Sequence, residues 1–268
     1  MVNYFAVILV CLLYVGATVV LYTNLTSAGA INGGRASKRS ALWLAAAALV
    51  LHAAIVWQRT GLPSSFSLPF FTAMSVTMLT MVLVQLLLCI RKPADYLGLA
   101  IYPLAAIGLA SSEIADTPAR ALPQSVQIHV LLSVMAYALL ALAAAQAVLV
   151  LVQRRQLNNH KPGGFMRALP PLTSTESLLF TLLAIGFGFL SLSLASGFMF
   201  LEDMFAQHLV HKTALSCAAW LVFAVLLYGR WRFGWRGQRV VHWTLGGFCM
   251  LLIAFFGSKL VLELILQR

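Results

Sequence analysis

Residues 126–152 read VQIHVLLSVMAYALLALAAAQAVLVLV, a run that contains no Asp, Glu, Lys or Arg. A hydrocarbon core of about 30 Å requires about 20 apolar residues of α-helix, so this run is long enough to cross a bilayer. In lipid the backbone amides must bond within the segment, which favours a helix. The run therefore predicts a transmembrane helix, and its polar residues, His129 above all, require a physical reason.

The rest of the chain has the same apolar character. Of its 268 residues 61% are hydrophobic and 9% are charged, and the mean hydropathy is +0.91. A soluble domain carries about a quarter charged residues, so we expect an all-α polytopic membrane protein, a bundle of about eight transmembrane helices. The expected spans are 4–22, 41–58, 68–90, 96–111, 126–152, 176–200, 211–229 and 240–262. Pro103 in the fourth span favours a kink or a re-entrant segment.

The loops between these spans are too short to fold as separate soluble domains. Residues 1–268 are therefore expected to form a single transmembrane domain. Its N-terminal four helices would occupy 1–125, and its C-terminal four helices would occupy 126–268.

Glu176 is an isolated carboxylate at the expected start of the sixth span, within the stretch TSTES. Ser174 or Thr175 is expected to cap this helix, because a hydroxyl can accept a hydrogen bond from the free amides of the first turn. A carboxylate in the first turn also suits the helix dipole, so a structural role is expected for Glu176.

The basic residues alternate between the two sets of loops. Most of the 18 Lys and Arg follow the first, third, fifth and seventh spans. Such residues mark the cytoplasmic side, so we expect a multi-pass protein of the bacterial inner membrane with both termini periplasmic. The net charge of +11 does not predict a nucleic-acid partner, because no basic run is interleaved with aromatic residues.

The expected topology sorts the histidines by depth. His160 falls in a cytoplasmic loop, and His242 falls at the cytoplasmic interface. His129 and His211 open the fifth and seventh spans at the outer side, and His52 lies about two-thirds of the way across the second. An ionisable group within the membrane indicates function, so the three deeper histidines predict a ligand site in one outer layer.

Haem fits such a layer better than zinc. Haem needs axial imidazoles, an apolar slot with aromatic walls, and cations for its propionates. We expect His129 and His211 to bind the haem iron, with Lys212 and Lys259 beside the propionates and His52 as a supporting partner or alternate ligand. The other candidate propionate partners are Arg59 and Arg120.

Zinc remains an alternative ligand for this region, and one further histidine lies near it. A zinc site would need an additional ligand at fixed geometry, and the nearest carboxylates are those of Glu202 and Asp203. His208 follows the acidic stretch FLEDMFAQ, so it is expected at the solvated rim rather than on iron.

The second half of the chain carries a family resemblance. The matching stretches are IHVLLSVMAYALLALA, LPPLTSTESLLFTLLAIGFGFLSLSLASGF, HKTALSCAAWLVFAVLLYGR, GWRGQRVVHWTLGGF and FFGSKLVLELIL. Together they resemble the cytochrome c assembly superfamily, which includes CcsA, CcmC and HemX, and in particular its small HemX-like YpjD branch. The resemblance implies haem handling at the outer face, in the service of c-type cytochrome maturation. In CcsA a histidine that opens the helix matching IHVLLS is a haem ligand, which implies that role for His129.

The sequence also departs from the superfamily pattern. The tryptophan-rich WWD motif is absent, and Lys212, Thr213 and Trp220 alone echo its tail. FFGSKLVLELILQR lacks the second external histidine of CcsA, and Tyr228 replaces an intramembrane one. A surface that presents haem to apocytochrome is therefore not expected. The assignment of His211 as the second axial ligand is inferred from its position in the chain and is not implied by the resemblance.

These observations favour a haem-binding accessory or carrier protein with non-covalent haem b. Its expected partners are haem, the lipid bilayer, and membrane proteins of cytochrome c maturation or the haem pathway. We expect no enzyme, because no nucleophile–base pair stands out. The alternative is a structural or regulatory partner of another membrane protein, without haem; a transporter of another solute would require charged residues near the midplane.

Overall fold

The computed structural model describes residues 4–26, 34–60, 68–113, 123–159, 169–200 and 207–257. All regular structure within these ranges is helical. Seven of the helices are long and apolar enough to cross a membrane, and Asp95–Ser111 forms a shorter apolar helical segment. The chain is thus a polytopic all-α membrane protein, which confirms the expected fold class.

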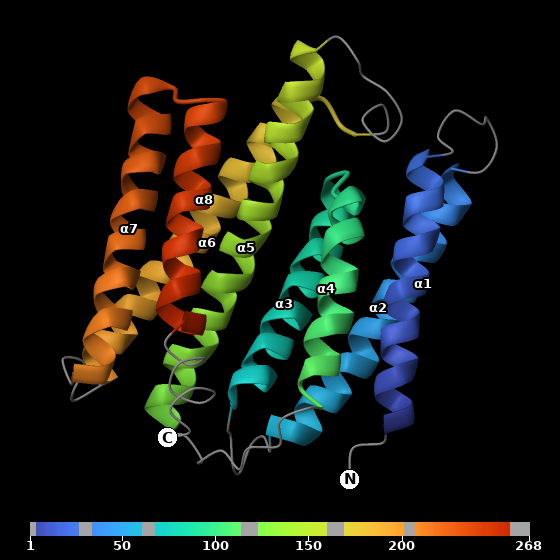
Figure 1. Cartoon of the computed structure of the whole chain (residues 1–268), viewed down its shortest axis with the longest axis horizontal. Helices are drawn as coiled ribbons and strands as arrows, with labels where there is room; N and C mark the ends of the chain where they lie inside the picture. The colour runs from blue at the N-terminus through green and yellow to red at the C-terminus, as the bar shows by residue number, and fades with distance from the viewer. Residues whose placement is uncertain are drawn as a thin grey trace. The chain divides into compact units, whose positions relative to one another are not determined.

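Figure 1 labels the helices in their order along the chain. They are α1 (Tyr4–Thr26), α2 (Gly34–Thr60), α3 (Phe70–Arg91), the 3-10 turn η1 (Asp95–Leu97), α4 (Gly98–Ser111), α5 (Gln124–Asn158), α6 (Leu172–Phe200), α7 (Gln207–Phe233), α8 (Gln238–Leu252) and the π-turn η3 (Ile253–Gly257). The short fourth helix continues through Pro103.

The chain divides into two compact units. Unit 1 comprises Met1–Ala121 and Gln156–Pro170, and unit 2 comprises Leu122–Arg155 and Pro171–Arg268. The expectation of a single transmembrane domain stays a prediction.

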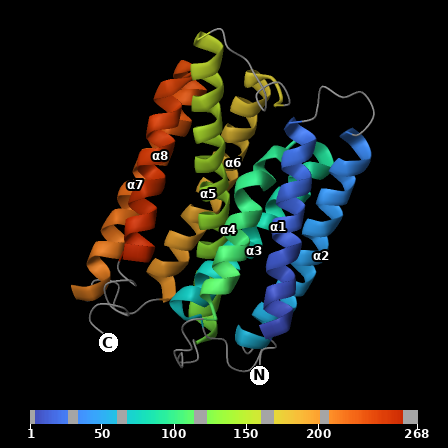
Figure 2. The same ribbon diagram turned by 45° about the vertical axis from the view of Figure 1, so that its right-hand side comes forward.

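Unit 1 is a ring of four helices in which α1 packs on α2 and α4, and α3 packs on α4 and α2 (Figure 2). The inward face of α2 carries Ala41, Ala45 and Ala48, all fully buried and three or four residues apart. Small side chains at helical spacing let backbones approach closely, which is how membrane helices gain packing energy without a hydrophobic driving force. The same face of α2 continues to His52, so this packing fixes the depth and direction of that imidazole.

Unit 2 is built from α5 to α8, with α6 packed on α7 and α7 on α8. Glycines permit the close approach: a Cβ at Gly186 of α6 would lie 2.9 Å from the Leu140 side chain of α5. A Cβ at Gly247 of α8 would lie 2.8 Å from the Phe223 ring of α7. A larger residue at either position would require these neighbouring side chains to shift.

The start of α6 differs from the expected one. The helix begins at Leu172, directly after Pro171, so Ser174 and Thr175 lie inside it and the expected cap is wrong. The Thr175 hydroxyl instead donates to Oε1 of Gln153 at 2.9 Å. Glu176 forms an ion pair with Arg154 of α5, with 3.5 Å between its Oε1 and the arginine Nε. The carboxylate therefore joins two helices of unit 2.

Candidate functional site

His129 lies near the start of α5, half-buried, and its ring is oriented by α6. Its Nδ1 is 2.9 Å from the Ser193 carbonyl oxygen and 3.1 Å from the Ser196 hydroxyl. A carbonyl can only accept, so we assign the proton of the neutral ring to Nδ1. The Ser196 hydroxyl donates to the same carbonyl at 2.8 Å, which leaves its oxygen free to accept from Nδ1. Nε2 then carries the lone pair.

A small serine cluster holds this arrangement in place. Ser133 donates to the His129 carbonyl at 2.8 Å, and its oxygen is 2.7 Å from the Ser193 hydroxyl. Ser193 and Ser196 are both buried, so these bonds form away from water. The backbone and the ring of His129 are thus both tied to the Ser193 turn of α6, which fixes the direction of Nε2.

Aromatic side chains make contacts between the helices of unit 2. Trp220 of α7 stacks on Phe187 of α6 with 5.4 Å between ring centroids, and its Nε1 donates to Ser191 at 2.8 Å. Tyr137 of α5 donates to the Leu251 carbonyl at 3.0 Å, and its ring is 5.2 Å from that of Phe255. These contacts join α6 to α7 and α5 to the end of α8.

The other expected haem contacts are described only in part. His208 and His211 lie near the start of α7, but their side chains fall outside the described part of the chain, as does all of Lys259. Lys212 is half-buried on α7. The iron ligands and propionate partners therefore stay predictions.

The zinc alternative gains no support from the described residues. No group of three or more His, Cys, Asp and Glu among them is arranged to hold a metal ion. Glu202 and Asp203, the nearest expected carboxylates, lie outside the described ranges.

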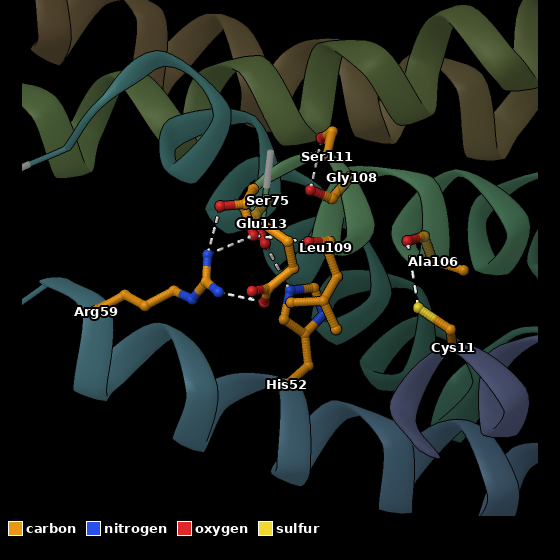
Figure 3. Close-up of polar contacts among 10 residues, drawn as sticks. Cys11, His52, Arg59, Ser75, Ala106, Gly108, Leu109, Ser111 and Glu113 are labelled. Atoms are coloured by element: carbon orange, nitrogen blue, oxygen red, sulfur yellow. Dashed lines mark hydrogen bonds and ion pairs between the residues drawn. The ribbon is translucent and has the colours of Figure 1, made fainter. Parts of the chain in front are cut away.

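His52 belongs to unit 1, where it is fully buried. Its Nδ1 is 3.2 Å from the Tyr14 hydroxyl on α1. Its Nε2 is 2.8 Å from the Ser75 hydroxyl on α3 (Figure 3). The Tyr14 ring stacks in turn on Tyr102 of α4, with 6.2 Å between centroids. Both ring nitrogens are thus occupied, so binding to iron would require one hydrogen bond to break.

Arg59, a candidate propionate partner, is also engaged within unit 1. Its Nη1 donates to the Ser112 carbonyl at 2.5 Å and to the Ser112 hydroxyl at 3.0 Å. Its Nη2 pairs with the Glu113 carboxylate (Figure 3). This guanidinium joins the end of α2 to the end of α4. Arg120 lies outside the described ranges.

Sequence reasoning missed the partners of both histidines. The run SLSLAS at 191–196 carries a serine at every second or third position of an otherwise apolar helix, which was a usable signal. Tyr14 and Ser75 gave no comparable signal, because isolated hydroxyls are common in membrane helices and their partners lie on other helices.

Comparison with known proteins gives a consistent result. The family described as "Cytochrome C assembly protein" matches residues 36–266. The inner membrane protein YpjD of Escherichia coli K12 is 34% identical over 87% of this chain and 90% of its own length. The cytochrome c biogenesis protein CcsA of Chlamydomonas reinhardtii is 25% identical over 51% of this chain and 38% of its own. Protein HemX of Brevibacillus brevis is 25% identical over 48% of each chain.

No solved structure matches the chain. The matched region begins in α2 and extends past α8, so it includes the helices that carry His52 and His129. A match of this extent, together with a relative aligned over nearly its full length, confirms the expected resemblance: the chain belongs to the cytochrome c assembly protein family.

Proposed function

We propose that this chain is a haem-binding protein of the bacterial inner membrane, an accessory or carrier in cytochrome c maturation or haem handling at the periplasmic face. The cofactor would be haem b, held without a covalent bond. The names of three relatives support this proposal: one is a cytochrome c biogenesis protein, one is HemX, and one is an inner membrane protein.

The observation that carries the proposal is the state of His129. Iron binds a neutral imidazole through a ring nitrogen that has no proton, and haem proteins fix that state with a hydrogen bond from the other nitrogen. The bond from Nδ1 to the Ser193 carbonyl does this here. His129 therefore fits an axial haem ligand in its chemistry as well as in its place in the chain.

The remaining roles follow the same chemistry. His211 is proposed as the second axial ligand, and Lys212 and Lys259 as cations for the propionates. His52 would act as a supporting residue, since both of its nitrogens are bonded in unit 1. Bound haem would supply a redox-active iron, and the protein would set its potential and release by burial.

The second candidate is a structural or regulatory partner of another membrane protein, without haem. The observation in its favour is the environment of His52. This buried histidine of α2 hydrogen-bonds through both ring nitrogens to side chains of the neighbouring helices α1 and α3. Purification from haem-replete cells separates the two candidates. A red protein with a Soret band supports haem binding, and a folded colourless protein that takes up no added haemin supports the partner role.

The proposed second ligand is tested with a neighbouring control. His211→Ala should lower the ratio of haem to protein, measured as the pyridine haemochrome, to a small fraction of the wild-type ratio. His208→Ala, three residues earlier on α7, should retain most of it. Size-exclusion profiles check folding, and full haem content in folded His211→Ala would remove this residue from the ligand set.

The proposed periplasmic location is tested by topology. A reporter active only in the periplasm should be active when fused after Arg268 and silent when fused near Asn158. The reverse result would place the start of α5, and His129 with it, on the cytoplasmic side.

A further inference from the structure

The turn between α7 and α8 concentrates positive charge in unit 2. Ten residues, 230–239, contain Arg230, Arg232, Arg236 and Arg239, and none of the ten is acidic. Glu176 is the only acidic residue in the described part of unit 2, and it pairs with Arg154. The arginines of the turn therefore have no carboxylate partner among the described residues of unit 2.

The turn makes close contacts with the helices beside it. Gly234 and Gly237 adopt φ values of 64° and 75°, a region that other residues rarely occupy. The Trp235 amide donates to the Gly229 carbonyl at 3.2 Å, and a Cβ at Gly229 would lie 2.5 Å from the Trp235 ring. Gly237 is buried against the Arg154 guanidinium, where a side chain would collide. The turn is thus docked on both α7 and α5.

The arginines divide into one structural and three outward-facing side chains. Arg230 is half-buried, stacks over Phe180 at 4.5 Å, and donates to the Trp235 carbonyl at 3.3 Å. Arg239 stacks over Trp235 at 5.2 Å, so an aromatic face supports an exposed guanidinium. The exposed arginines of the turn are therefore Arg232, Arg236 and Arg239.

Large aromatic side chains next to these arginines in the sequence are also exposed, and Arg232 lies over the Phe233 ring at 5.9 Å. Trp231 is 81% exposed, Phe233 65% and Tyr228 55%. Exposed aromatics at the end of a membrane helix lie at the level of the lipid headgroups. The guanidinium groups of the same turn then lie at the level of the lipid phosphates.

We propose that Arg232, Arg236 and Arg239 form a binding site for the phosphate of an anionic phospholipid, with Trp231 and Phe233 against its glycerol and acyl region. Guanidinium groups bind phosphate oxygens in pairs of parallel hydrogen bonds. A soluble phosphate would satisfy the charges but would make no contact with the aromatic side chains. A membrane phospholipid offers an anion directly beside an apolar chain, which matches both halves of the site.

The site is tested by native mass spectrometry of the full chain, titrated in detergent with phosphatidylglycerol or phosphatidylcholine. The wild type should bind its first phosphatidylglycerol at least about ten-fold more tightly than phosphatidylcholine. The variant R232Q/R236Q/R239Q should lose this preference. The control R39Q/R91Q/R155Q removes the same charge from exposed positions elsewhere and should keep it.

Two further measurements identify the class of ligand. Trp231→Ala should weaken phosphatidylglycerol binding although all the arginines remain. Glycerol phosphate, which has the anion without acyl chains, should not displace the bound lipid at equal concentration. Equal loss of preference in the control variant, equal binding of the two lipids by the wild type, unchanged binding by Trp231→Ala, or displacement by glycerol phosphate would each overturn the proposal.

Discussion

The imidazoles of His52 in unit 1 and His129 in unit 2 are both held by hydrogen bonds between transmembrane helices, but to different kinds of group. His52 bonds to two hydroxyls, those of Tyr14 and Ser75, one at each ring nitrogen. His129 bonds through Nδ1 alone, to a backbone carbonyl and a hydroxyl on one turn of α6.

The difference lies in what each partner can accept or donate. A hydroxyl can do either, so the proton of His52 can sit on either nitrogen while both hydrogen bonds persist. A carbonyl only accepts, so the proton of His129 is fixed and Nε2 keeps its lone pair. The first arrangement is suited to joining three helices, and the second is suited to offering a ligand atom.

The largest expected effect is on haem. His129→Ala should weaken haem binding by at least about 100-fold, because loss of an axial ligand exceeds the effect of losing its hydrogen-bond partner. His52→Ala should leave the affinity within about three-fold of the wild type. Haemin titration followed at the Soret band measures both. A strong loss of haem affinity in folded His52→Ala, with affinity retained in His129→Ala, would make His52 the iron ligand and His129 the structural residue.

For the stability of the fold, His52 is expected to matter more than His129. His52→Ala should lower the free energy of unfolding by about 3 kcal/mol, because two buried hydroxyls lose their partner and a cavity remains. His129→Ala should cost about 1 kcal/mol, since its ring is half-buried. Denaturant unfolding in detergent measures both changes. The exposed His242→Ala is the matched control, expected within about 0.5 kcal/mol of the wild type.

The two hydroxyls beside His52 should each matter less than the ring. Tyr14→Phe and Ser75→Ala are each expected to lower the free energy of unfolding by about 1 kcal/mol. Because both hydroxyls contact one imidazole, the double variant should differ from the sum by about 0.5 kcal/mol or more. Simple additivity in the double-mutant cycle would mean that the imidazole does not couple α1 to α3.

The smallest effect is expected at Ser196. Ser196→Ala removes one acceptor of the His129 Nδ1 proton, but the Ser193 carbonyl remains, so haem affinity should fall only about three-fold. The exposed Ser177→Ala on the same helix should not change it. A loss as large as that of His129→Ala would show that the hydroxyl, and not the carbonyl, orients the ring.

Hydropathy predicted the spans because lipid selects apolar side chains, but it could not predict helix ends outside the lipid. α5 continues through Arg154 and Arg155 to Asn158, six residues past the expected end, because arginines favour a helix as well as an interface. α6 begins four residues before the expected position, since Pro171 allows a helix to start in a stretch of mixed polarity.

By itself, the sequence determined that the chain is an all-α membrane protein, which family it belongs to, and which histidines fall within membrane helices. Composition and span length suffice for the fold class and the spans, because each span must satisfy the same bilayer. The family followed from the resemblance of particular stretches in the second half of the chain. Only the tertiary structure decided which atoms those histidines meet. The partners of His52 lie 38 and 23 residues away, and the carbonyl that orients His129 lies 64 residues away. A backbone carbonyl belongs to every residue, so no sequence pattern marks the one that a folded helix turns toward an imidazole.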